Sequence, residues 1–398
     1  MKQSTNLRAL FVSLATLGAG LTPGFAAAQT PTAQAPATPE ISPAELATAS
    51  AQAAARAKAP VVKAGYKVPR LSTGRPDLSG VWTNASTTSL ERARNLGLRG
   101  TLSNEEMTRI EKETFARNAR QNAQTPKEVQ DNWTKTGAGP DTADECRSGA
   151  RGPACGYNAG WTDPGDWVMR VNGEGRTSLI TYPANGRMPA RLSGATAGRA
   201  RIVTSSEEDA TRGAADNPED RSLGERCIMS FGVSSGPIMT PQLYNNTYQF
   251  VQTPDNFVIW VEMVHDTRII KMDGRHRTDG IRPWMGDQIG WWDGDTLVVE
   301  TVGYHPKQNV RGGGPNLKLT ERFTRVAEDR LHYAFNVEDP DTWAEPWGGE
   351  YEFAAVADHV YEYACHEGNY GLAGILSGAR ADDEKAAAAK TIKAKAGK

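Results

Sequence analysis

Short strand-like segments about ten residues apart, joined by turn residues, constrain the fold of this chain more than any other feature. They are densest in residues 244–300, where segments at 247–252 and 257–270 are rich in β-branched and aromatic residues. The dipeptide Asp293-Gly294 lies between two such runs and predicts a hairpin. Because no strand–helix–strand rhythm interrupts the series, we expect a mainly β protein: an antiparallel meander or lipocalin-like barrel with a few peripheral helices.

The regions on either side extend the same pattern. Asn172-Gly173 is a turn dipeptide of the kind that joins hairpin strands. Ser103 and Glu106 form the S-x-x-E signature of a helix start, which predicts a helix to residue 121 within a helical part at 88–124. Further strands are expected at residues 80–82, 167–171, 177–182, 317–326, 331–337, 351–353 and 360–365.

The first residues have the features of a targeting segment. Lys2 and Arg8 supply positive charge, residues 9–20 are apolar but too short for a membrane anchor, and residues 26–28 form an A-x-A cleavage signal. The sequence therefore predicts a cleaved signal peptide at residues 1–28 and a periplasmic protein with no membrane span. An uncleaved anchor is the alternative.

Composition divides the rest of the chain into three parts. Residues 29–66 are rich in Ala, Pro, Thr and Gln, which predicts a disordered linker that is flexible or partly helical. Residues 67–380 carry the strand and turn signals of one β-rich domain, and residues 381–398 have the blocks of Ala and Lys of a flexible or helical tail. The 45 basic and 47 acidic residues are interspersed, with a formal charge of -2. This balance argues against a nucleic-acid partner, which needs a basic face.

Four cysteines in an exported protein favour two disulfide bonds, for which three pairings are open. We favour Cys146 with Cys155, across a short Gly-rich loop, and Cys227 with Cys365, which would join the start of the strand-rich region to its end. No C-x-x-C motif and no cysteine–histidine cluster with zinc-finger spacing is present, so the sequence predicts no metal site.

Two histidines, His265 and His366, and the adjacent Glu367 are the catalytic candidates, for acid–base chemistry. On an unbroken strand at 257–270, His265 would lie at the inner end of an apolar row. His366 and Glu367 follow Cys365 directly, so a disulfide bond there would hold them rigidly. The structural alternatives are a hydrogen-bonded core histidine at position 265 and a turn cap formed by the other pair.

Aromatic and basic residues in the same regions are candidates for ligand contacts. Amphipathic rings can stack on an aromatic ligand, and arginine can bind a carboxylate or phenolate. Alternatively, the rings fill a barrel and the arginines form surface ion pairs. The substrate-binding candidates are Tyr244, Tyr248, Arg268, Arg282, Trp284 and Tyr363.

Several short motifs are spread over most of the chain after the signal peptide. They are D-L-S-G-V-W at 77–82, R-T-S-L-I at 176–180, E-R-C at 225–227, Y-N-N-T-Y-Q at 244–249, H-D-T-R at 265–268, W-M-G-D at 284–287, G-D-T-L-V-V-E-T at 294–301, L-T-E-R-F at 319–323 and Y-E-Y-A-C-H-E-G-N-Y at 361–370. Together they resemble a family of exported proteins of soil bacteria. The resemblance implies membership of that family and carries over no catalytic residue. The G-x-W of the first motif is similar to the first strand of lipocalin-type barrels, which by analogy implies only the fold.

The motifs that the chain lacks narrow its chemistry. Without G-x-G-x-x-G after a strand and without H-E-x-x-H, we expect no nucleotide cofactor and no zinc centre. A G-x-S-x-G match occurs at 232–236, but no strand–helix–strand rhythm surrounds it, so we expect no α/β-hydrolase. The first hypothesis is a periplasmic, cofactor-independent enzyme of the lyase, isomerase or hydratase type, acting on a small hydrophobic, aromatic or phenolic compound through His265 and His366. The alternative is a non-catalytic binding or carrier protein for a hydrophobic ligand. A third is an envelope interaction protein that uses an exposed insertion at 192–226. The oligomeric state is left open.

Overall fold

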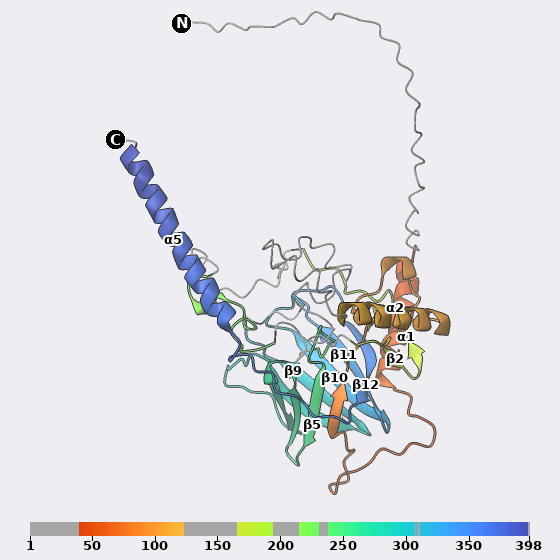
Figure 1. Cartoon of the computed structure of the whole chain (residues 1–398). Coiled ribbons are helices and arrows are strands. Elements are labelled where there is room, and N and C mark those ends of the chain that lie inside the picture. Colours follow the sequence, from red (N-terminus) through yellow and green to blue (C-terminus); the bar gives the residue numbers. More distant parts are fainter. Residues whose placement is uncertain are drawn as a thin grey trace, which may run out of the picture. The chain divides into compact units, whose positions relative to one another are not determined.

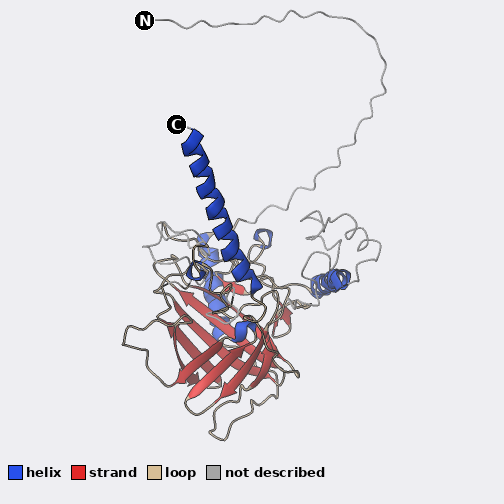
Figure 2. Ribbon diagram, turned by 60° about the vertical axis from the view of Figure 1, so that its left-hand side comes forward, coloured by secondary structure: helices blue, strands red, loops and turns tan. Residues whose placement is uncertain are grey.

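A closed β-barrel forms the centre of the protein in the computed structural model (Figures 1 and 2). The structure describes residues 40–122, 165–193, 215–230, 238–306, 308 and 311–396. In this part of the chain nine strands close the barrel, because the last of them pairs back to the first. In order around the barrel they are β1 (Gly80–Thr83), β5 (Thr247–Gln252), β6 (Asn256–Val261), β7 (Thr267–Met272), β8 (Asp287–Asp293), β9 (Thr296–Val302), β10 (Lys318–Ala327), β11 (Arg330–Glu338) and β12 (Trp347–Ala355).

The fold class is the one that the sequence predicts, mainly β with a barrel and a few helices around it. All neighbouring barrel strands are antiparallel except β7 and β8, which run parallel with Lys271 opposite Ile289. Parallel neighbours cannot be joined by a tight hairpin and need a longer connection. Residues 273–286 provide it, so the barrel is mixed rather than purely antiparallel.

Alternation along each strand sends one set of side chains into the barrel. On β11 the interior set is Leu331, Tyr333, Phe335 and Val337, all essentially inaccessible to solvent. The turns between strands also follow the sequence signals. Asp293 pairs with Thr296, so Gly294 and Asp295 form the turn between β8 and β9, and Gly294 has a φ of +60°, a left-handed conformation that glycine adopts readily.

The single long strand predicted at 257–270 is wrong, because the chain turns back in its middle. β6 and β7 are separate antiparallel strands, and between them lies η6 (Met263–His265), a short 3₁₀ turn. Val264 and His265 have φ values of +57° and +46° there, and a β-branched residue in that region is uncommon. The turn places His265 on the surface instead of on an inward-facing row.

The small hairpin before the barrel strands is shorter than predicted. β2 (Arg170–Val171) and β3 (Glu174–Gly175) pair across the predicted turn, whose Asn172 and Gly173 have φ values of +52° and +79°. β4 (Ile180–Tyr182) pairs with β12. The strand predicted at 360–365 is wrong, because those residues form no strand.

α2 (Asn104–Asn122) begins at the predicted capping box. Ser103 Oγ accepts a hydrogen bond from the backbone N–H of Glu106 at 3.2 Å, and Glu106 Oε2 accepts one from the N–H of Ser103 at 2.8 Å. The part of 88–124 that precedes α2 contains, as its described helix, only the short η1 (Arg94–Leu96).

α1 (Pro43–Lys58) lies within the segment 29–66, so part of the predicted linker is helical. Ser42 caps the helix by accepting a hydrogen bond from the N–H of Glu45 at 3.2 Å. Alanine favours helix and has a small side chain, so an Ala-rich helix can lie close to a sheet. The resulting cluster on the outside of the barrel consists of Ala53, Ala57, Tyr182 and Ala334.

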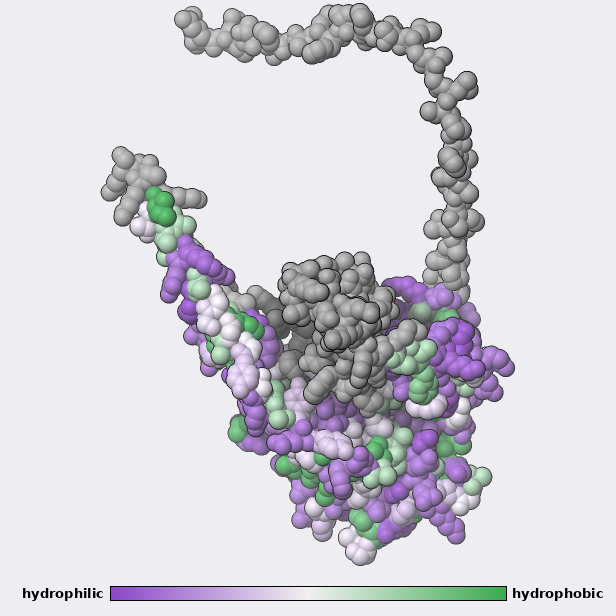
Figure 3. Space-filling model, in the orientation of Figure 1, coloured by the Kyte–Doolittle hydropathy of each residue, from purple (hydrophilic) through white to green (hydrophobic). Residues whose placement is uncertain are grey.

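α5 (Tyr370–Ala396) extends through most of the predicted tail at 381–398, which is therefore helical where the structure describes it. Figure 3 shows hydrophilic and hydrophobic residues mixed along α5 and over the face in view. No helix within the described residues has the length and apolar character needed to cross a membrane. The predicted signal peptide, the Cys146–Cys155 pair and most of the insertion at 192–226 lie outside the described residues.

A buried ionic cluster lies on the outer side of β11 and β12. His332 Nε2 donates to Glu350 Oε2 at 3.0 Å, and Arg176 Nη2 donates to Glu350 Oε1 at 2.7 Å. Burial alone would raise the pKa of Glu350. The hydrogen bond from His332 and the charge of Arg176 outweigh it, so the pKa lies below the ordinary value of 4.5.

We expect acid to weaken the fold through Glu350. Since its pKa is lower in the folded than in the unfolded chain, its carboxylate contributes stability above pH 4.5 that is lost as the pH falls through 4.5 toward the folded-state pKa. Glu350→Gln should lower the free energy of unfolding at neutral pH and flatten its acid dependence. Urea unfolding between about pH 3 and pH 7 measures both effects. Glu345→Gln, at an exposed position, is the control. Equal acid dependence in the two variants would contradict the assignment.

Candidate functional site

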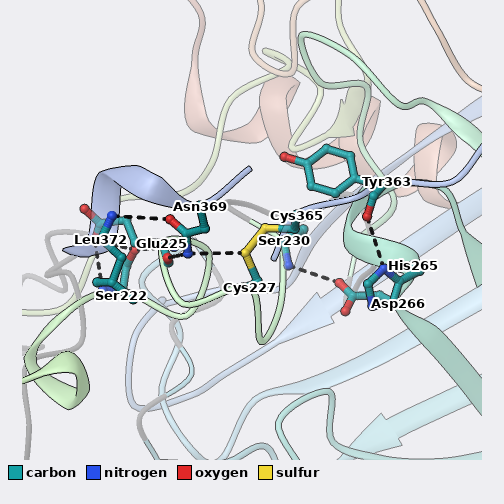
Figure 4. The surroundings of a disulfide bond; sticks show 10 residues. All are labelled: Ser222, Glu225, Cys227, Ser230, His265, Asp266, Tyr363, Cys365, Asn369 and Leu372. Atoms are coloured by element: carbon teal, nitrogen blue, oxygen red, sulfur yellow. Dashed lines mark hydrogen bonds between the residues drawn. A yellow bond between two sulfur atoms is a disulfide. The ribbon is translucent and has the colours of Figure 1, made fainter. Parts of the chain in front are cut away.

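A disulfide bond joins Cys227 and Cys365, as the sequence predicts (Figure 4). Their Cα atoms are 5.8 Å apart, across a sequence separation of 138 residues. Asn369 reinforces the link, since its Nδ2 donates to the backbone oxygen of Glu225 at 2.8 Å and lies 3.6 Å from Cys227 Sγ. The two loops therefore form one cross-linked unit.

A groove of about 1040 Å³ lies beside this disulfide bond. Its walls come from the two cross-linked loops, the segment just before β5 and the first turns of α5. Its volume is that of sites for small organic molecules. The ionisable side chains that line it are Tyr244, Tyr361, Tyr363, Glu225, Glu262, Asp358, Glu362 and His359.

Two of the predicted ligand-binding residues, Tyr244 and Tyr363, line this groove together. Their rings are nearly parallel, with an interplanar angle of 6° and centroids 6.4 Å apart. Both side chains are half-buried. Tyr363 lies two residues before the disulfide-bonded Cys365, which restrains its backbone. Rigid aromatic faces of this kind attract planar rings and cations.

Glu262 is the most buried carboxylate of the groove, with 9% of its surface exposed. Its Oε2 accepts a hydrogen bond from the backbone N–H of Thr247 at 3.2 Å. Within the described residues no lysine or arginine forms an ion pair with it. Asp358, by contrast, is exposed and accepts a hydrogen bond from the Tyr361 hydroxyl at 3.0 Å, which raises the pKa of Tyr361.

None of the three predicted catalytic residues lines the groove. His265 is exposed, and its Nδ1 lies 3.4 Å from the backbone oxygen of Tyr363, a main-chain contact that Figure 4 shows. His366 and Glu367 are exposed beside Cys365. The groove therefore does not bring His265 and His366 together as an acid–base pair.

Arg268 lies inside the barrel, in what we call the interior polar cluster: Arg268, Gln288, Glu321 and Tyr333. Its Nη1 and Nη2 donate to the two carboxylate oxygens of Glu321, the first at 3.0 Å, and its Nε donates to Gln288 Oε1 at 2.9 Å. The Tyr333 hydroxyl donates to Glu321 Oε1 at 2.8 Å. Because all three guanidinium nitrogens donate hydrogen bonds to neighbouring side chains, Arg268 stabilises the barrel interior in this arrangement.

Tyr248 is also buried inside the barrel. Its ring fills the barrel interior, which is the alternative to ligand contact that the sequence left open for this residue. Its hydroxyl accepts a hydrogen bond from Asn84 Nδ2 at 3.3 Å. Asn84 and the Tyr351 hydroxyl both donate to the backbone oxygen of Met239. A short segment around Met239 thus enters the barrel and supplies a partner for buried polar groups. Burial raises the pKa of Tyr248 and of Tyr351.

Arg282 and Trp284 belong to the loop before β8 and do not line the groove. Arg282 is exposed, and its Nη1 donates to the backbone oxygen of Pro315 at 3.4 Å. Trp284 is half-buried and stacks on the ring of His305, with centroids 3.8 Å apart. Their predicted role as ligand contacts stays a prediction.

Glu262 and Glu321 were not among the residues predicted from the sequence. A signal existed for Glu321, which stands between Leu319 and Phe323 on the inward face of an alternating strand. Glu262 gave no such signal, because its position depends on the unexpected turn at η6.

Within the described part of the chain no group of three or more His, Cys, Asp or Glu side chains is arranged to hold a metal ion. Comparisons of the chain with protein-family models, with curated proteins and with solved structures found no match. The site must therefore be interpreted from its own geometry.

Proposed function

We propose that this protein is an exported binding or carrier protein for small aromatic compounds, and that the groove beside the disulfide bond is its binding site. The observation that carries the proposal is the pair of nearly parallel rings of Tyr244 and Tyr363 on the groove wall. Export is supported by the signal-like residues 1–28 and by the disulfide bond, because such bonds form in oxidising compartments.

The binding function fits the groove better than the acid–base enzyme does. A binding site needs a concave surface with aromatic walls and a few polar groups, and these groups line the groove. An acid–base enzyme needs two groups within hydrogen-bond reach of one substrate atom. His265 and His366 do not line the groove.

We expect at least one of three probes to bind in the groove: 2-phenylethanol, 2-phenylethylamine or 3-phenylpropionate. Each has one phenyl ring, and the three differ in the polar group at the end of the chain. Tyr363→Ala and Tyr244→Ala should each weaken binding about tenfold, because the loss of one aromatic contact costs roughly 1.4 kcal/mol of binding free energy. Isothermal titration calorimetry measures the affinities. Tyr370→Ala removes an exposed tyrosine that does not line the groove and should change nothing. If none of the three probes binds, or if Tyr370→Ala is as harmful as the other two, the proposal is wrong.

An enzyme acting on the same class of compound is the second candidate. The observation that favours it is the hydrogen bond between Tyr361 and Asp358, which places a proton donor and a carboxylate together in the groove. A bound probe can be recovered after prolonged incubation and analysed by mass spectrometry. Chemical change that Tyr361→Phe abolishes and that His265→Ala and His366→Ala leave intact would establish a tyrosine-based enzyme. Loss of turnover in the histidine variants would restore the mechanism predicted from the sequence.

A further inference from the structure

We infer that the groove selects organic cations, with the ammonium group held by the Glu262 carboxylate and the faces of Tyr244 and Tyr363. This inference rests on the proposed binding function and names the class of its ligand. It differs from the expectation drawn from the sequence, in which arginines would hold a carboxylate or phenolate.

The charge of the groove points to a cation. Its described lining contains four carboxylates and one histidine, but neither lysine nor arginine. One carboxylate, that of Glu225, is bonded to Arg221 at 2.5 Å. The other three, Glu262, Asp358 and Glu362, form no ion pair with a lysine or arginine in the described residues. Such a concave acidic surface attracts cations and repels anions.

Glu262 identifies where the positive charge would sit. A charge that is removed from water is costly unless a counter-charge or several hydrogen bonds compensate it. Glu262 is nine-tenths buried, yet its side chain makes one hydrogen bond, to the N–H of Thr247 at 3.2 Å. An ammonium group supplies both the missing charge and further N–H donors.

Tyrosine rings line the same groove as this carboxylate. Thr247, its bonding partner, is three residues from Tyr244, and the ring of Tyr244 is parallel to that of Tyr363. The charge of Glu262 also contributes to raising the pKa of Tyr361, after the larger effects of Asp358 and of burial, so a third tyrosine lies within its field. Tyrosine rings beside a carboxylate are the chemistry by which proteins recognise ammonium groups.

The arginines of the chain that were expected to bind an anion are elsewhere. Arg268 is committed to Glu321 inside the barrel, and exposed Arg282 contacts Pro315. Neither lines the groove.

The three probes of the binding experiment test the inference on the unmodified protein. 2-Phenylethylamine, which is protonated at pH 7, should bind at least about tenfold more tightly than neutral 2-phenylethanol, and 3-phenylpropionate should bind most weakly. Raising the salt concentration should weaken only the binding of the cation. Equal or tighter binding of 3-phenylpropionate would overturn the cation inference and leave the proposed binding function standing. Absence of binding by all three probes would overturn the binding function itself.

The Glu262→Gln variant tests whether Glu262 is the group that recognises the positive charge of the ligand. Glutamine keeps an oxygen that can accept the Thr247 N–H bond, so the variant is expected to fold. It should bind 2-phenylethylamine about 10- to 100-fold more weakly and 2-phenylethanol with less than about threefold change. Glu367→Gln, at an exposed glutamate outside the groove lining, is the matched control and should retain the preference. A cation preference that survives in Glu262→Gln would show that Glu262 is not the recognising group.

Discussion

Arg268→Met is expected to lower the free energy of unfolding by about 3–5 kcal/mol. The change removes the three hydrogen bonds of the guanidinium group and leaves Glu321 as an unpaired charge in the barrel, where its surface is 0% exposed. A buried carboxylate without its partner either loses hydration at great cost or takes up a proton. Either response favours the unfolded chain at neutral pH. Urea unfolding monitored by tryptophan fluorescence measures the loss.

The double variant Arg268→Met/Glu321→Leu distinguishes the cost of removing the whole ion pair from the cost of leaving Glu321 without its partner. Replacing both charges with apolar side chains removes the uncompensated charge, so most of the stability should return. Arg282→Met is the control for the substitution itself, because Arg282 is exposed, and it should change stability by less than about 0.5 kcal/mol. If Arg268→Met proves as mild as Arg282→Met, the ion pair with Arg268 does not stabilise the buried Glu321 carboxylate as expected, and the prediction is wrong.

The sequence predicted the barrel because its strongest strands obey local rules. β10 and β11 alternate inward and outward residues along their length, and the hairpin predicted near Gly294 forms there, with Gly294 in a left-handed conformation. Local rules failed at residues 262–266. That segment contains no Gly, Pro or Asn to announce a turn, and Val264 adopts a positive φ under tertiary constraint.

That one turn explains why the candidate site was only partly predicted. The inward set changes from odd-numbered residues such as Ile259 on β6 to even-numbered ones such as Arg268 on β7. If residues 257–270 formed one continuous strand, His265 would point into the barrel and Arg268 would point outward. Tyr244 and Tyr363 were recognised as candidates by residue type. Their mutual orientation depends on contacts between distant segments, which local patterns do not encode.

The Cys227→Ser/Cys365→Ser variant is expected to lose about 5 kcal/mol of stability in the chain-entropy model, because the bond closes a loop of 138 residues. Ordinary domains have a total stability of about 5–15 kcal/mol, so the loss would be a large part of it. Ligand binding should fall as well, since both cysteines line the groove and Cys365 restrains the backbone next to Tyr363. Chemical denaturation and calorimetry with 2-phenylethylamine measure the two effects on the same samples.

The Cys146→Ser/Cys155→Ser variant is the matched control for this experiment. Both cysteines lie outside the described residues, and the sequence predicts that they close a short loop, for which the same model gives only about 3 kcal/mol. Its ligand affinity should equal that of the unmodified protein. If both double variants lose stability equally but keep full affinity, the disulfide bond at Cys227 does not organise the groove. The affinities are compared without denaturant, where both variants remain folded. If affinity falls only in Cys227→Ser/Cys365→Ser, the Cys227–Cys365 bond positions Tyr363 for the ligand in addition to stabilising the chain.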